Sequence, residues 1–329
     1  MRRVAVVFAV LAALVVPGTA AAHVVRGAPV ATDFSARIRG LVPPADAVRA
    51  VVVDGDRQLS LTVAPSAQVA IPGALGEPLL RFTPAGVFVN RRSLTAQSDR
   101  VAPGALRPVA NPQAPPLWHR LTTGHTYRWH EHRLHALEPL AARRASEAEL
   151  GRWAVPLLID GRRHALIGTL RYRPPGATWA WIGGACGLAI LVCALVAAAR
   201  PAWQGATVAV AVAAVVLTGT IRIARELYGR PDLAASNFLA IAFTTAVGAA
   251  LLWALLRGPG GVPLFTACLV GIGSLFQGIA FAPMVTHGYA LTVLPTAAAR
   301  AGVTSILGLG AGLLAVTLWA QFGPERAAA

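Results

Sequence analysis

Hydrophobic and polar positions are distributed unevenly along this chain of 329 residues. Residues 23–177 alternate short apolar runs with Pro, Gly and charged residues, whereas long apolar stretches follow one another over residues 178–322. The first pattern is typical of short β-strands joined by turns, and the second is typical of membrane-spanning helices. The sequence therefore predicts an N-terminal all-β domain followed by an all-α transmembrane region.

Five segments of the C-terminal half have the length and apolarity of transmembrane helices. They run over about residues 179–199, 207–223, 234–256, 262–281 and 303–322. Ionisable residues are scarce within them. Arg222 and Glu226 are spaced i, i+4 near one end of the second segment, so we expect them to pair with each other or to extend toward the membrane surface.

The N-terminal segment has the organisation of a secretory signal peptide. Two arginines precede an apolar run, a Pro-Gly pair ends it, and Ala20–Ala22 fit a small-residue cleavage site. We expect residues 1–22 to be removed and residues 23–177 to lie outside the cytoplasm, and an uncleaved anchor would place them on the same side. With five spans, residues 323–329 then form a short cytoplasmic tail of a multi-pass plasma-membrane protein.

Turn signals divide the exported segment into short strands. The sequence DGD at 54–56 and the pair Asp160-Gly161 each separate two β-like runs, a pattern typical of hairpins. We therefore expect an antiparallel β-sandwich of immunoglobulin or cupredoxin type. The Pro-rich residues 100–117 are expected to form an irregular crossing or loop, and a short helix is expected within 138–150.

Charge and cysteine content narrow the function classes. All basic residues are Arg, and residues 23–177 contain 20 Arg against 11 Asp and Glu. Such a domain beside a membrane suits the anionic headgroups of the lipid bilayer, whereas the scattered placement of its arginines disfavours nucleic-acid binding. All three cysteines lie in the apolar half, so the exported segment has no disulfide, thiolate metal site or cysteine nucleophile.

Histidine provides the candidate chemistry. The stretch HTYRWHEHRLH at 125–135 holds four of the eight histidines. On a strand, His130 and His132 would project from the same face and lie close enough to share one metal ion. His125 or His135 would add a third nitrogen if the strand bends, and signal-peptide cleavage would leave His23 with a free amino group beside its imidazole.

Imidazole nitrogens without sulfur favour copper by the affinity order of divalent metals. We therefore predict a membrane-anchored domain that binds or handles a copper ion, with His130 and His132 as the core ligands and His125, His135 and His23 as candidates to complete the site. The alternative is a non-enzymatic envelope protein whose outer domain binds a protein partner, with the same histidines in a structural network. A third possibility is a subunit of a larger transporter.

Other activities lack the patterns they require. The stretch is not the HExxH pattern of metalloproteases, and neither a Ser or Cys nucleophile pattern nor a paired-carboxylate signal accompanies the histidines. A nucleotide-binding loop is also missing from the sequence, which disfavours ATP-driven transport by this chain alone. We predict that the protein is not an enzyme.

Two segments also carry a resemblance to a known family. GEPLLRFTPAGVFVN at 76–90 and YRWHEHRLH at 127–135 resemble the GEPYLR-like and WHDHRxHW-like segments of an uncharacterised family of actinobacterial exported membrane proteins. Glu131 stands where that family usually has Asp, and Ala136 where it usually has Trp. The family brings no established activity. A looser likeness to secreted copper-resistance chaperones rests on His23 and the expected fold class.

Overall fold

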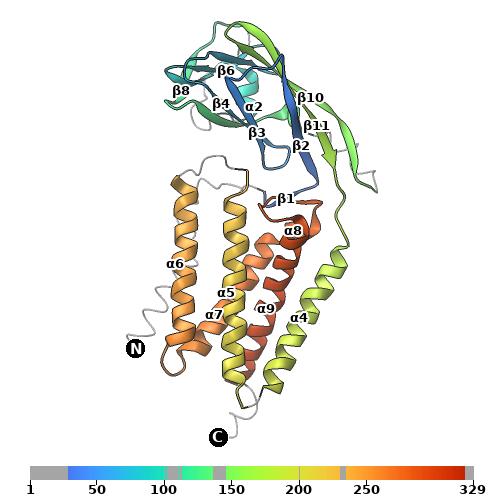
Figure 1. Cartoon of the computed structure of the whole chain (residues 1–329), viewed down its shortest axis with the longest axis vertical. Helices are drawn as coiled ribbons and strands as arrows, with labels where there is room; N and C mark the ends of the chain where they lie inside the picture. The colour runs from blue at the N-terminus through green and yellow to red at the C-terminus, as the bar shows by residue number, and fades with distance from the viewer. Residues whose placement is uncertain are drawn as a thin grey trace.

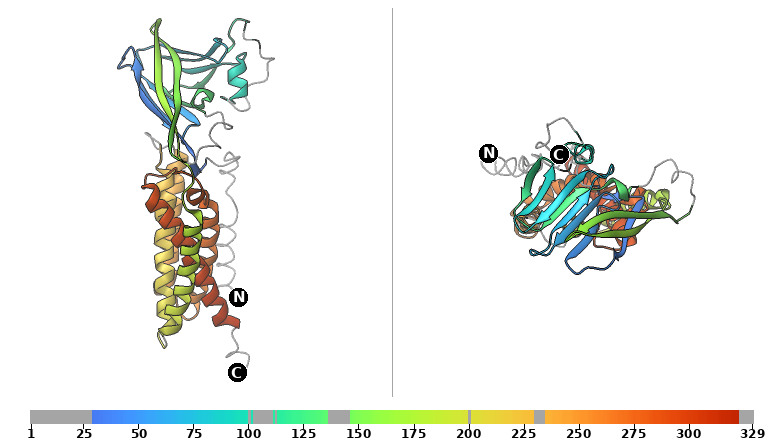
Figure 2. Two further views of the ribbon diagram at one scale, coloured as in Figure 1. Left: turned by 90° about the vertical axis from the view of Figure 1, so that its right-hand side faces the viewer. Right: turned by 90° about the horizontal axis from the view of Figure 1, so that it is seen from above.

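The protein consists of a β-domain standing at one end of a helical bundle (Figures 1 and 2). Every strand pair among the described residues is antiparallel, and five helices are long and apolar enough to span a membrane. The predicted fold class is confirmed. This computed structural model describes residues 29–99, 101, 111, 113–135, 146–199, 201–229 and 235–322.

Two sheets form the body of the β-domain. The larger has seven strands in the order β2-β11-β10-β5-β6-β7-β8, and the smaller has three in the order β3-β4-β9. The larger sheet comprises β2 (Phe34–Val42), β5 (Val69–Pro72), β6 (Pro78–Thr83), β7 (Gly86–Asn90), β8 (Trp118–Thr122), β10 (Ala148–Ile159) and β11 (Arg162–Tyr172). The smaller comprises β3 (Val48–Val53), β4 (Gln58–Val63) and β9 (Thr126–His130), and the short helices are α2 (Leu94–Ser98) and the 3-10 turn η2 (His132–Leu134).

One hydrophobic core joins the two sheets. Leu59 and Leu61 of β4 are fully buried, as are Val87 and Val89 of β7 in the other sheet. Each pair occupies alternate positions of its strand, so both side chains project from the same face. Full burial of such a side chain stabilises the fold by about 1.5–3 kcal/mol relative to its exposure.

The two predicted hairpin turns are confirmed. Asp54 and Gly55 have φ values of 57° and 81° between β3 and β4, and Asp160 and Gly161 have 47° and 79° between β10 and β11. Asp160 and Gly161 form a two-residue loop, and positive φ at both of its residues is the geometry that joins twisted antiparallel strands most tightly. Asp54 and Gly55 are the first two residues of a four-residue loop between Val53 and Gln58. The sequence signal is strong here because the turn geometry is local.

The helical bundle matches the predicted spans to within a few residues at most ends. Helix α9 packs against α4, α5 and α7, whereas α6 packs against α5 and α7 (Figure 1). The second and fifth helices begin earlier than predicted. The long helices are α4 (Thr178–Ala198), α5 (Trp203–Glu226), α6 (Ala235–Arg257), α7 (Val262–Phe281) and α9 (Thr296–Phe322), with the short α8 (Pro283–Thr286) after α7.

Backbone contacts join the start of the β-domain to the helical half of the chain. The two-stranded sheet at their junction pairs β1 (Ala31–Thr32) with β12 (Tyr289–Ala290), which lies between α8 and α9. The backbone N–H of Gly288 also donates to the Asp33 carboxylate at 2.7 Å. The segment that leads into β2 is therefore held by the helical half of the chain.

The structure differs from some of the predicted elements, and other predictions concern residues outside the described ranges. Residues 148–150 begin strand β10 rather than a short helix. Helix α2 was not predicted, and its N-cap is the Ser93 hydroxyl, which accepts the N–H of Ala96. The proposed signal peptide at 1–22 and tail at 323–329 lie outside the described residues.

Substitution of Gly168 tests the packing of the larger sheet. A Cβ at Gly168 of β11 would overlap the ring of Trp153 on β10, whereas a Cβ at Gly151 of β10 meets nothing within 4 Å. We expect Gly168→Ala to lower the free energy of unfolding by about 1–3 kcal/mol, because overpacking forces the indole to move. Gly151→Ala is the matched control with little change. Urea unfolding of the full chain in detergent, followed by near-ultraviolet circular dichroism, compares the two.

Candidate functional site

Three of the predicted histidines lie side by side at the end of β9. The ring centroids of His130 and His132 are 5.0 Å apart, those of His130 and His135 are 4.7 Å apart, and those of His132 and His135 are 5.8 Å apart. The Nε2 atoms of His130 and His135 are 3.2 Å apart. We call these three residues the histidine cluster.

The cluster forms by a turn of the chain and not by strand alternation. Strand β9 ends at His130, Glu131 caps the following 3-10 turn, and His132 is the first residue of that turn. The prediction that His130 and His132 share the face of one strand is therefore wrong in its geometry. Their rings nevertheless lie side by side. The 3-10 turn reverses the direction of the chain, so His135, three residues after His132, also lies beside His130.

Two buried carboxylates hold the outer rings of the cluster. His132 Nδ1 pairs with Asp99 Oδ1, and His135 Nδ1 lies 3.3 Å from Asp56 Oδ2. Both aspartates are only 4% exposed. In each of these two rings the Nδ1 atom is occupied by a carboxylate. The Nε2 atom of His135 also shares a hydrogen bond with His130 Nε2 in the ion-free structure.

Two acceptor oxygens beside the cluster lack a hydrogen-bond partner. Among the buried carboxylate and amide oxygens of the described residues, Asp99 Oδ2 and Gln58 Oε1 are the ones without a partner. Asp99 contacts His132, and Gln58 lies opposite His130 in the pairing of β4 with β9. An unpaired buried acceptor is costly, so a donor or a cation bound at this place would be favourable for both atoms.

Glu131 forms a complete hydrogen-bond network beneath the cluster. Its carboxylate accepts from Trp129 Nε1 at 3.0 Å and from Arg133 Nε and Nη2 at 2.6 and 2.7 Å. Burial alone would raise the pKa of the Glu131 carboxyl, but the bonds and charge of Arg133 and the Trp129 N–H outweigh it and hold that pKa below its ordinary value. This part of the stretch is a structural network, as the alternative interpretation expected.

The environment of His130 lowers the pKa of its imidazole and so favours the neutral form. Burial lowers the pKa of His130 below its ordinary value, and the neighbouring His135 and His132 rings lower it further, while Asp99 opposes them. A neutral imidazole has a free lone pair and is the form that binds metal ions. The residue therefore retains its ligand form to lower pH than an exposed histidine.

The other predicted ligands lie elsewhere. His125 precedes β9, about 17 Å of extended chain from His130 at the usual strand rise, and its backbone carbonyl accepts from Val63. Its Nε2 atom is buried without a partner. His23 lies outside the described residues. His119, another histidine of the β-domain, is exposed on β8 opposite Val89.

Sequence reasoning missed the two aspartates of the site. Asp56 belongs to the DGD turn, which the sequence identified only as a hairpin signal, and it is 79 residues from His135. Asp99 follows α2, in a segment without any motif. Neither contact has a local signal because it depends on the packing of distant strands.

The polar residues of α5 contact neighbouring helices. Arg222 Nη1 donates to Gln277 Oε1 of α7 at 2.9 Å, and Asn237 Nδ2 of α6 donates to Glu226 Oε2 at 2.7 Å. Each of the two residues thus has a hydrogen-bond partner on a neighbouring helix. Such bonds stabilise the packing of helices in an apolar environment.

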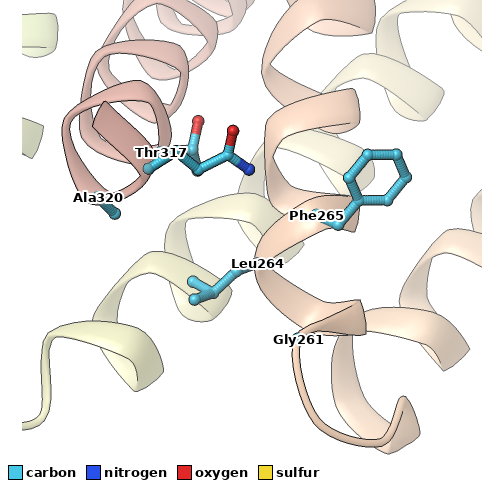
Figure 3. Close-up of a pocket in the computed structure, with 6 residues that line it drawn as sticks. Gly261, Leu264, Phe265, Thr317 and Ala320 are labelled. Atoms are coloured by element: carbon cyan, nitrogen blue, oxygen red, sulfur yellow. The ribbon is translucent and has the colours of Figure 1, made fainter. Parts of the chain in front are cut away.

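A pocket lies between α7 and α9 (Figure 3), at the end of the bundle away from the β-domain (Figure 1). Its polar side chains are those of Thr317 and Gln321, and Thr317 already donates to the Leu313 carbonyl. None of its lining residues is titratable, so the histidine cluster is the stronger candidate site. The pocket lining consists of Gly261, Leu264, Phe265, Thr317, Ala320 and Gln321.

The cluster is not a closed metal cage. No group of three or more His, Cys, Asp or Glu side chains in the described parts of the chain is placed to hold a metal ion together. The two atoms best placed to share an ion are the Nε2 atoms of His130 and His135. The His132 side chain is 58% exposed, and its Nδ1 atom contacts the Asp99 carboxylate.

Comparisons with known proteins identify no relative: no family model, curated protein or solved structure matches the chain. The resemblance to an actinobacterial exported membrane-protein family therefore stays a prediction. The site must be interpreted from its own geometry.

Substitution of Glu131 tests the network beneath the cluster. We expect Glu131→Gln to lower the free energy of unfolding by about 3 kcal/mol, because it leaves the Arg133 charge without its buried partner. Glu149→Gln on β10 is the matched control. Its ion pair with Arg39 is exposed and 3.8 Å long, so the change should stay below about 1 kcal/mol. Urea unfolding of the full chain in detergent measures both, and equal effects would contradict the assigned role.

The lowered pKa of His130 predicts a pH dependence of stability. Between the folded pKa and the unfolded value near 6.5, the unfolded chain binds more protons, so this residue destabilises the fold as pH falls through that window. We expect His130→Gln to reduce the loss of thermal stability on acidification from about pH 7 to about pH 5. Unfolding midpoints of the metal-free full chain across this range test it, and identical slopes for variant and wild type would refute it.

Proposed function

We propose that the β-domain binds a copper ion at the histidine cluster, outside the cytoplasm, and that the five apolar helices anchor it in the membrane. His130 and His135 are the central ligands, and His132 would complete the set once its ring turns, because no three such side chains of the described residues are already placed around one ion. The observation that carries this proposal is the approach of two Nε2 atoms to 3.2 Å, beside rings whose Nδ1 atoms are held by buried carboxylates.

The spacing of the nitrogens supports a shared ion. Two imidazole nitrogens about 2.0 Å from one ion lie about 2.8 Å apart in a square-planar site and about 3.3 Å apart in a tetrahedral site. The separation between His130 Nε2 and His135 Nε2 is 3.2 Å, within this range. The two rings therefore need little movement to bind one ion.

The two carboxylates occupy the positions that orient the rings of metal-binding histidines. A metal-binding imidazole usually donates its other N–H to a carboxylate or carbonyl, which fixes the ring and raises its basicity. Asp56 occupies this position on His135, and Asp99 occupies it on His132. A ring held in this way through Nδ1 presents Nε2 to the ion.

Copper is favoured by the donor set. The histidine cluster contains nitrogen donors and no sulfur, and Cu(II) heads the affinity order of divalent first-row metals at such donors. The exposed side chain of His132 leaves one side of the cluster open. An open site suits uptake and release of an ion and supports handling rather than permanent storage.

The proposed placement of the domain rests on the signal-like N-terminus. Export would set the β-domain on the outer surface, where its excess of arginine faces anionic lipid headgroups. The helices that surround α9 have apolar exposed side chains, which suits contact with lipid. The helical half then serves at least as an anchor.

The second candidate function is partner binding by an outer domain with structural histidines. The Glu131 network favours it, because that part of the stretch is fully satisfied without any ligand. The unpaired Asp99 Oδ2 argues against it for the histidines themselves. An envelope protein or a transporter subunit is the partner class that this alternative proposes.

Metal titration of the purified full chain in detergent tests the proposal. We expect one Cu(II) per chain by isothermal calorimetry, and at least a tenfold weaker affinity in His130→Gln and His135→Gln, because each removes a ligand from a small donor set. His119→Gln on β8 is the matched control and should bind as the wild type does.

Two outcomes would contradict the copper site. If the wild-type chain binds no Cu(II), the histidine cluster has a structural role instead. Tighter binding of Zn(II) than of Cu(II) would keep the site and change its ion. Circular dichroism of each variant separates lost binding from lost folding.

A further inference from the structure

The turn between β3 and β4 contacts both the histidine cluster and the helical bundle. It comprises Asp54, Gly55, Asp56 and Arg57. Its first two residues have positive φ, and the Gly55 carbonyl accepts from the N–H of Ala36 on β2 at 3.0 Å. The turn is therefore tightly defined, and its two acidic side chains point to different partners.

One partner lies on a membrane helix. Asp54 Oδ1 is 3.2 Å from Arg225 Nη2 in the last turn of α5, and both residues are buried, at 4% and 6% exposure. The same guanidinium nitrogen donates to the Pro29 carbonyl at 2.8 Å. Removal of either partner from such a buried pair leaves the other charge buried without compensation, which strongly destabilises the fold.

The other partner lies in the histidine cluster. Asp56 Oδ2 contacts His135 Nδ1, two residues along the turn from Asp54. The Arg57 carbonyl accepts from the N–H of Glu131 at 3.1 Å, which ties the end of the turn to the end of β9. A single tight turn thus joins a candidate ligand to a membrane helix through two buried carboxylates.

We propose that the β3–β4 turn couples the histidine cluster to α5, so that an ion at the cluster and the Asp54–Arg225 contact stabilise each other. This inference rests on the proposed function and names the regulation of that site. An ion on His135 Nε2 makes the Nδ1 proton a stronger donor to Asp56. The stronger bond restrains the turn, and the restrained turn presents Asp54 to Arg225.

The coupling is reciprocal, so it can be measured at the histidine cluster or at the Asp54–Arg225 contact. If the docked contact strengthens ion binding by some factor, ion binding strengthens the docked contact by the same factor. We expect this factor to be about 5 or more, the usual lower range of coupling between linked sites. Loss of the contact at α5 must then weaken binding at a cluster that Arg225 does not touch.

The first experiment measures Cu(II) binding to the full chain in detergent by calorimetry. We expect Arg225→Gln and Asp54→Asn each to weaken binding about fivefold or more, and the double variant to weaken it no further than either alone, because the two residues act through one contact. Arg222→Gln, one turn away on α5 and bonded to α7, is the matched control without effect. Unchanged binding in folded Arg225→Gln and Asp54→Asn overturns the coupling.

The second experiment needs no metal and separates this inference from the copper site. Hydrogen–deuterium exchange of the metal-free full chain compares the wild type with Asp56→Asn. We expect faster exchange at residues 223–229 as well as at the turn, because loss of the His135 contact loosens Asp54. Exchange changes confined to residues 54–57 and 130–135 overturn the coupling. If the wild type binds no Cu(II) but exchange changes at residues 223–229, the proposed function fails, and the link between the histidine cluster and α5 stands without its ion.

Discussion

The arrangement of the candidate site depends on the burial of one carboxylate. Glu131 is 1% exposed and has a set of N–H donors around it from Trp129 and Arg133, including the backbone N–H of Arg133. A buried charge is stable only with such donors, and they can surround it only if the chain turns directly after β9. The same turn brings His132 and His135 around to His130. The three rings therefore lie together because the chain turns to supply hydrogen-bond donors to the Glu131 carboxylate.

A second buried carboxylate decides how the two halves of the molecule meet. Asp54 could not be buried at the base of the β-domain without Arg225, and Arg225 could not be buried at the end of α5 without Asp54. The paired strands β1 and β12 add backbone hydrogen bonds at the same junction. The β-domain is therefore seated on the bundle through several kinds of contact (Figure 2). A flexible linker alone would allow the two halves to move independently.

Local patterns in the sequence were sufficient for the fold class, the five long helices and the two Asp-Gly turns. Each of these depends on residues that are neighbours in the chain, such as Asp160 and Gly161 with their positive φ values. The three histidines of the cluster were also predictable as a group, since they lie within six residues of one another. Their geometry was not, because strand alternation stops at His130. Asp56 and Asp99 were out of reach, since only the packing of distant segments brings them to the rings.

The hydrogen bonding of Glu131 differs from that of Asp99, and the difference favours the proposed ligand at the histidine cluster over a purely structural role. Both carboxylates are almost fully buried, and both contact the same eleven-residue stretch. Each oxygen of Glu131 accepts at least two hydrogen bonds, whereas Asp99 Oδ2 accepts none within the described residues. A cluster whose only role is to stabilise the fold gains nothing from an unpaired buried oxygen, which costs about 1–3 kcal/mol. That cost is offset if the negative charge beside His132 serves to hold a cation near the open side of the rings.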